Sequence, residues 1–134
     1  MQLQAAVQPN VAALYVLRGG PYYGLPDVDP WDEARDARSY PGPLPVVAHP
    51  PCARWGRFAT GGPRYLAQGK PRKAIGDDGG CFKAALAAVR TWGGVLEHPA
   101  DSYAWPYHEL KAPPRAGQWV PAGDGVGWTC CVER

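Results

Sequence analysis

One segment of the chain, residues 45–97, has the order strand, helix, strand, and this order constrains the fold more than any other feature. The two strands are short apolar runs, PVVAH at residues 45–49 and VLE at residues 95–97. A strand that returns to the same sheet through a helix runs parallel to the first strand. The segment therefore predicts a parallel βαβ unit and, with it, an α/β fold.

The helix between these strands carries the clearest pattern in the sequence. Its apolar residues recur at spacings of three and four, so they share one face. They are Phe82, Ala85, Leu86 and Val89. Asp77 or Asp78 is placed to cap the first turn, and Gly93 with Gly94 follows the last turn, where glycine commonly ends a helix. We therefore expect an amphipathic helix that buries one side.

The rest of the chain is rich in loops. The 17 Gly and 16 Pro residues make up about a quarter of the 134 residues, which favours long ordered loops around a modest core. We expect a strand over residues 11–17, a loop over 20–30, a short helix over 31–40, a long loop over 52–76 and a terminal hairpin from 118–120 and 126–132. A chain of this length fits one domain. The prediction is a single α/β domain, residues 1–134, with a small, mainly parallel sheet.

Composition and the pattern of apolar residues bear on the cellular location of the protein. Hydrophobic residues make up 46% of the chain, which is enough for a core. We expect no membrane span, because no apolar run reaches about 18 residues, and no secretory signal, because the start lacks its pattern. The four cysteines show no spacing typical of a disulfide framework. The sequence therefore predicts a cytoplasmic protein with free thiols.

A basic segment runs from Arg54 to Lys73. It holds six cations and no acid, with Trp55, Phe58 and Tyr65 among the charges. Cations that neutralise phosphates, beside rings that stack on bases, are typical of nucleic-acid binding. The predicted contacts to DNA are Arg54, Trp55, Arg57, Arg64, Lys70, Arg72 and Lys73. The alternative is a solvated loop whose aromatic residues tuck into the core.

Reactive side chains follow both strands of the βαβ unit. The first strand leads into His49-Pro50-Pro51-Cys52, and the second leads into Glu97-His98-Pro99. Ligands of a parallel sheet bind beyond the carboxyl ends of its strands, and proline fixes the backbone there. If the two strands are neighbours, a thiol and a carboxylate face one crevice.

These two segments together resemble the central part of the DNA cytosine-C5 methyltransferases. That part has a strand followed by Pro-Cys, then a helix, then a strand ending in Glu-X-Pro or Glu-X-Val, and in this chain it covers about 55 residues, Val46 to Pro99. The chain is most similar to short phage and prophage proteins of that superfamily, which share Ala-His-Pro-Pro-Cys and Val-Leu-Glu-His-Pro segments. The resemblance implies a methyltransferase-like (Rossmann-type) core reduced in size, acting in a bacterial cytoplasm.

The resemblance also implies roles for individual residues. Cys52 would be the nucleophile that attacks C6 of a flipped-out cytosine, in DNA or in a nucleotide. Glu97 would be the acid that holds the ring at N3, so that negative charge accumulates at C5, and His98 is a further catalytic candidate. The chemistry agrees, because cations such as Arg54 and Arg57 favour a thiolate. A carboxyl group that donates a proton needs a pKa raised by burial.

S-adenosylmethionine is the cofactor that the resemblance implies. The family's cofactor site begins with a strand and a Phe-x-Gly-x-Gly loop, whereas this chain has Leu17-Arg18-Gly19-Gly20-Pro21 in the corresponding place. The family's target-recognition region also has no counterpart among the 134 residues. We therefore assign no cofactor-binding residues from the sequence.

Two further interpretations use the same residues. Without catalysis, the chain would be a small binding protein, either an anti-defence inhibitor with a host-protein partner or a nucleic-acid-binding accessory. A metal site would combine His49, Cys52 and His98 with Cys130 or Cys131. No Cys-x-x-Cys pair supports such a site, so we expect no metal. The sequence leaves the oligomeric state open.

Overall fold

The computed structural model describes residues 8–132, which form two compact units. The first unit joins the chain up to Pro50 to the segment Ala84–Glu97, and the second joins Pro51–Lys83 to the chain from His98 onward. The chain therefore passes from one unit to the other within both segments that carry the reactive side chains. The single domain expected over residues 1–134 stays a prediction.

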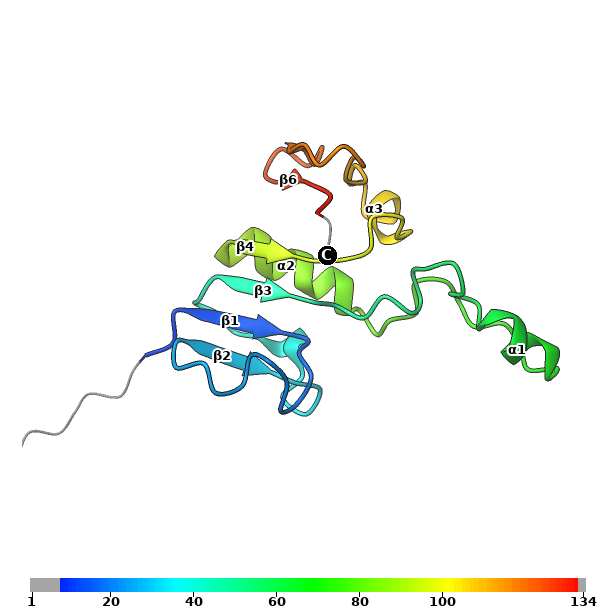
Figure 1. Cartoon of the computed structure of the whole chain (residues 1–134), viewed down its shortest axis with the longest axis horizontal. Coiled ribbons are helices and arrows are strands. Elements are labelled where there is room, and N and C mark those ends of the chain that lie inside the picture. The colour runs from blue at the N-terminus through cyan, green and yellow to red at the C-terminus, as the bar shows by residue number, and fades with distance from the viewer. Residues whose placement is uncertain (1–7, 133–134) are drawn as a thin grey trace, which may run out of the picture. The chain divides into compact units, whose positions relative to one another are not determined.

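The first unit is built on a four-stranded parallel sheet (Figure 1). Its strands are β1 (Val11–Leu14), β2 (Val28–Trp31), β3 (Val46–Ala48) and β4 (Gly94–Leu96), in the spatial order β2-β1-β3-β4. β1 pairs in parallel with β2 and with β3, and β3 pairs in parallel with β4. The predicted α/β class, the small parallel sheet and the parallel βαβ unit are confirmed.

Small residues form the core of this unit. Ala12, Leu14, Val46 and Ala48 are fully buried, and so is Ala85 from the helix α2 (Cys81–Trp92). Alanine at the contact lets the helix approach the sheet closely, and burial of apolar area stabilises by roughly 25 cal/mol per Å². The buried position of Ala85 confirms the predicted apolar face of the helix.

Two glycines connect α2 to β4. Gly93 and Gly94 have φ values of 84° and 127°, which favour glycine. The carbonyl of Gly93 accepts a hydrogen bond from the Val46 backbone N–H at 3.0 Å, and a Cβ on Gly94 would overlap the backbone of Val46. The glycine stop predicted from the sequence therefore also fixes the register of β4 against β3.

The structure corrects the predictions for residues 20–40. A strand, β2, occupies the end of the expected loop and the start of the expected helix, and only a short 3-10 helix, η1 (Ala37–Ser39), follows. The sequence VDPW does not predict a strand, because Asp and Pro are depleted in strands. β2 lies at the edge of the sheet, where Pro30 is tolerated without a backbone N–H. β1 is also shorter than expected, because Tyr15 adopts a φ of 61°.

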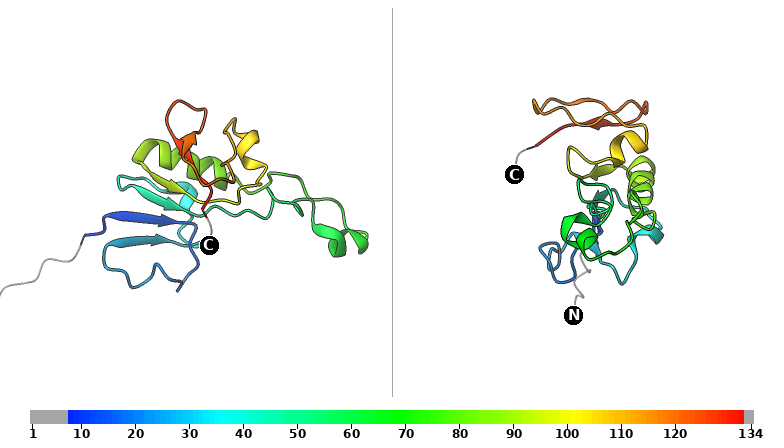
Figure 2. Two further views of the ribbon diagram at one scale, coloured as in Figure 1. Left: turned by 45° about the horizontal axis from the view of Figure 1, so that its top comes forward. Right: turned by 90° about the vertical axis from the view of Figure 1, so that its right-hand side faces the viewer.

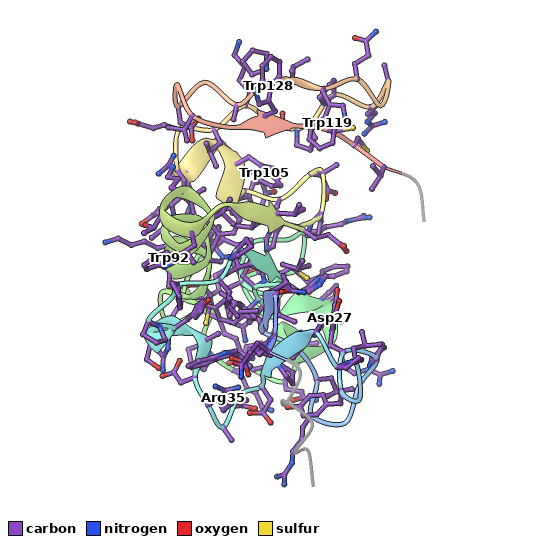
Figure 3. All side chains as sticks on the ribbon, turned by 90° about the vertical axis from the view of Figure 1, so that its left-hand side faces the viewer. Asp27, Arg35, Trp92, Trp105, Trp119 and Trp128 are labelled. Carbon is purple, nitrogen blue, oxygen red and sulfur yellow. The ribbon has the colours of Figure 1, made fainter. Side chains whose placement is uncertain are left out.

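The second unit contains two short helices and a hairpin. α1 (Gly62–Ala67) lies within the segment expected to be a loop, so that expectation was wrong there, and α3 (Ala104–Tyr107) follows later. β5 (Val120–Pro121) and β6 (Trp128–Thr129) pair antiparallel, which confirms the terminal hairpin. Two exposed indoles, Trp119 and Trp128, lie on this hairpin (Figure 3).

Two further observations concern residues 8–132. No helix in this range is long and apolar enough to cross a membrane. All four cysteines lie in this range, and none of them forms a disulfide.

Candidate functional site

The carboxyl ends of β3 and β4 lie side by side in the first unit. Ala48 and Leu96 are partners in the parallel register, so His49 and Glu97 are the first residues beyond the two strands. Their backbone N–H groups still belong to the ladder: Glu97 donates to Ala48 at 2.9 Å, and His49 donates to Leu14 at 3.0 Å. The fold thus delivers an imidazole and a carboxylate to the edge of the sheet where ligands bind.

Tyr22, from the loop after β1, completes this group. Its hydroxyl lies 2.7 Å from Nε2 of His49, and Nδ1 of the same ring lies 3.8 Å from Oε2 of Glu97. We call Tyr22, His49 and Glu97 the sheet-edge triad. The Glu97 side chain is 39% exposed, which is less burial than an acid with a raised pKa was expected to need. Sequence reasoning missed Tyr22, for which the available signal was a tyrosine pair in a Gly- and Pro-rich loop.

Cys52 opens the second unit in a turn that is held by Trp55. The Trp55 backbone N–H donates to the Cys52 carbonyl at 3.0 Å, and Cys52 is exposed. The Trp55 side chain is 2% exposed, and its indole Nε1 donates to Oδ2 of Asp78 at 2.8 Å. The same carboxylate oxygen accepts from the backbone N–H of Phe82 at 2.9 Å. One carboxylate therefore joins the Cys52 turn to the start of α2.

The packing of Trp55 argues against the DNA contact that we predicted for it. Its ring centroid lies 6.0 Å from that of Phe82, 5.1 Å from that of Tyr107 and 5.5 Å from that of His108. A ring covered by these neighbours has no face left on which a base can stack. For Trp55 the alternative interpretation, an aromatic side chain tucked into the core, fits the structure.

His98 belongs to the same aromatic cluster of the second unit. Its ring centroid lies 5.0 Å from Phe82 and 6.1 Å from Trp105, and its Nε2 lies 3.5 Å from the Pro51 carbonyl oxygen. Nδ1 is buried and has no hydrogen-bond partner among the residues that the structure describes. Burial lowers the pKa of His98 below its ordinary value of 6.5, so the ring is neutral at pH 7.

Cys52 and Glu97 belong to different units. The structure brings Glu97 together with His49 and Tyr22 in the first unit, and it places Cys52 in the Trp55 turn of the second. The predicted pairing of the thiol with the carboxylate stays a prediction.

The basic segment forms an arm with two limbs in the second unit (Figures 1 and 2). The chain leads into α1 and then returns alongside itself. Two backbone hydrogen bonds join the limbs: Lys73 donates to Thr60 at 2.9 Å, and Gly76 donates to Arg54 at 2.7 Å. We call residues 52–76 the basic arm.

Most of the charge on the basic arm is exposed. Arg57, Arg64, Lys70 and Arg72 are exposed, while Arg54 and Lys73 are half-buried. Phe58 is 56% exposed. The ammonium groups of Lys70 and Lys73 lie 5.3 and 4.7 Å from the ring centroid of Tyr65. Exposed cations beside ring faces suit a strand of nucleic acid, whose phosphates and bases they can contact together.

An open hollow of about 430 Å³ lies at the carboxyl ends of β1 and β2. It is lined by Val16, Leu17, Arg18, Asp32, Glu33 and Ala34. Asp32 accepts hydrogen bonds from the Tyr23 hydroxyl at 2.8 Å and from the Arg35 backbone N–H at 3.1 Å. These bonds lower the pKa of Asp32, so it is ionised at neutral pH. Sequence reasoning missed this hollow because it missed the strand β2.

Within residues 8–132, no group of three or more His, Cys, Asp and Glu side chains is placed to hold a metal ion. Comparison of the chain with protein-family models, curated proteins and solved structures found no match.

Proposed function

We propose that the protein is a cytosine-C5 methyltransferase-like protein that acts on or binds a pyrimidine in DNA or in a nucleotide. Cys52 is the nucleophile and Glu97 the acid. The observation that carries this proposal is the parallel pairing of β3 with β4, because one strand leads into Pro50-Pro51-Cys52 and the other into Glu97. The sheet order β2-β1-β3-β4 supports a reduced methyltransferase-like (Rossmann-type) core. A cytoplasmic location is part of the proposal.

The chemistry uses the chain's own groups in two stages. The thiolate of Cys52 adds to C6 of the pyrimidine, and the C5–C6 double-bond electrons move to C5 and the ring. Glu97 hydrogen-bonds N3 and gives a proton to it, which stabilises that charge. In the second stage C5, having used its electron pair to accept a methyl group, loses its original proton, the C5–C6 double bond forms again, the Cys52 thiolate leaves, and the proton on N3 returns to Glu97.

We propose the hollow at β1 and β2 as the site for S-adenosylmethionine. The volume of the hollow, about 430 Å³, lies in the range of small-molecule sites. Val16 and Leu17 offer an apolar wall for the adenine, and the exposed carboxylate of Glu33 can accept hydrogen bonds from ribose hydroxyls. We propose that these residues hold the cofactor, which supplies the methyl group when bound.

The basic arm supports DNA as the partner. We propose phosphate contacts for its six cations, Arg54, Arg57, Arg64, Lys70, Arg72 and Lys73, with the exposed ring of Phe58 as the face for a base. Trp55 is left out of this set because it is buried. Base flipping costs a few kcal/mol, and stacking on exposed rings offsets part of that cost.

Covalent trapping tests the proposal. The probe is an oligonucleotide with 5-fluorocytosine, single- or double-stranded, incubated with and without S-adenosylmethionine. Fluorine at C5 cannot be lost as the proton would be, so the bond between Cys52 and C6 persists. We expect a cofactor-dependent adduct that is absent in Cys52→Ala. Cys131→Ala is the matched control and should retain the adduct.

The opposite result is equally informative. If folded protein forms no adduct on either form of DNA, the proposal that it is an enzyme is refuted. DNA binding that weakens with salt, in the absence of any adduct, would leave the nucleic-acid-binding accessory as the better interpretation.

A further inference from the structure

We infer that Tyr22 and His49 are positioning residues for Glu97, so that the sheet-edge triad works as one unit. The inference rests on the proposed function, because it takes Glu97 as the acid. All three residues belong to the first unit, and two of them directly follow paired strands. Neither Tyr22 nor His49 belongs to the pair of residues that the resemblance assigned.

The geometry selects one tautomer of His49. A carboxylate oxygen of Glu97 lies 3.8 Å from Nδ1, and a negative oxygen favours the ring proton on the nitrogen that faces it. Nε2 is then a bare acceptor, and the Tyr22 hydroxyl at 2.7 Å donates to it. Tyr22 thus locks the ring with its Nδ1–H toward Glu97.

This arrangement helps most when the acid acts. Glu97 acts as the acid from its protonated form and returns to the carboxylate as the proton moves to N3 of the pyrimidine. The Nδ1–H of His49, which faces that carboxylate in the protein without a pyrimidine, then stabilises the restored negative charge. Such a contact is stronger in the transition state than in the ground state, so it raises the rate more than the affinity. The 3.8 Å separation is long for a hydrogen bond, as is common for catalytic groups before a ligand binds.

The first test reads the tautomer and requires no activity. Nitrogen-15 NMR of the full chain shows which ring nitrogen of His49 carries the proton. We expect Nδ1–H in the wild type and a mixture of tautomers in Tyr22→Phe. Tyr23→Phe is the matched control, because its hydroxyl donates to Asp32, and it should leave the His49 signals unchanged. An unchanged tautomer in Tyr22→Phe overturns the inference, whether or not the protein is an enzyme.

The second test follows the rate of adduct formation on the 5-fluorocytosine oligonucleotide. We expect a loss of about 10-fold in Tyr22→Phe and about 100-fold in His49→Ala, with little change in the half-saturating oligonucleotide concentration. His49→Asn, whose amide N–H can take the place of Nδ1–H, should recover most of the rate. Equal rates of adduct formation in His49→Ala and the wild type overturn this inference but leave the proposed function standing. No adduct in the wild type instead overturns the proposed function, and with it the role of Glu97.

Discussion

Replacement of Asp78 by alanine tests how the turn that carries Cys52 is held. The Asp78 carboxylate accepts hydrogen bonds from the backbone N–H groups of Gly80 and Phe82, both at 2.9 Å, and from the Trp55 indole at 2.8 Å. Loss of a helix cap costs about 0.5–2 kcal/mol. A buried indole N–H left without its acceptor costs about 1–3 kcal/mol. Asp78→Ala should therefore lower the free energy of unfolding by roughly 2–4 kcal/mol.

The assay is thermal unfolding followed by circular dichroism. At this chain length a loss of 1 kcal/mol lowers Tm by about 3–4 °C, so Asp78→Ala should lower it by about 6–16 °C. Asp77→Ala removes the same charge from the exposed neighbouring position and should change stability by less than about 0.5 kcal/mol. Equal effects of the two substitutions would refute the assignment of Asp78 as cap and anchor.

Three further predictions concern the glycine turn, His98 and the basic arm. Gly94→Ala places a Cβ against the Val46 backbone at a positive φ and should cost more than about 3 kcal/mol in urea unfolding. A Cβ on Gly93 would meet open space, so Gly93→Ala should cost only about 1 kcal/mol. A smaller loss of stability in Gly94→Ala than in Gly93→Ala would contradict the close contact of Gly94 with the Val46 backbone. Because burial holds the pKa of His98 below 6.5, the unfolded chain takes up the proton first, and stability falls as the pH drops from 6.5 through the folded pKa. His98→Gln should flatten this part of a curve of Tm against pH, and an unchanged curve would argue that His98 is not buried. The triple variant Arg64→Ala, Lys70→Ala, Arg72→Ala should reduce the slope of log K against log salt for duplex DNA by about 2–3. Lys83→Ala, Lys111→Ala and Arg115→Ala remove the same charge from exposed positions outside the basic arm, and an equal effect there would refute the arm as the DNA contact.

The βαβ unit could be predicted because its signals are local. Short apolar runs, a helical repeat and two glycines specified β3, α2 and β4 with little help from the rest of the chain. β2 was missed because its stability comes from pairing with β1 and not from its own residues, of which Asp29 and Pro30 disfavour a strand. The hollow at β1 and β2 was missed with it.

The residues of the site were predictable only where a reactive side chain comes directly after a strand. His49 and Glu97 were found at strand ends, but Tyr22 reaches His49 from 27 residues away, and no local pattern reports such a contact. Composition also cannot show which aromatic residues are buried, so Trp55 was grouped with the exposed Phe58. The choice of Asp78 over Asp77 as cap likewise depends on the buried indole that Asp78 also binds.

Exchange of the cytosine C5 hydrogen with solvent tests most directly whether Cys52 and Glu97 activate a pyrimidine. Addition of the Cys52 thiolate to C6 places an electron pair at C5, which can take a deuteron from heavy water before the thiolate leaves, without any methyl donor. Mass spectrometry of the recovered nucleoside measures the incorporation. We predict deuterium at C5 with the wild type, slower incorporation with Glu97→Gln, none with Cys52→Ala and no change with Cys131→Ala. No incorporation by folded wild-type protein on single- and double-stranded DNA, or equal incorporation by Cys52→Ala, would contradict the proposed chemistry.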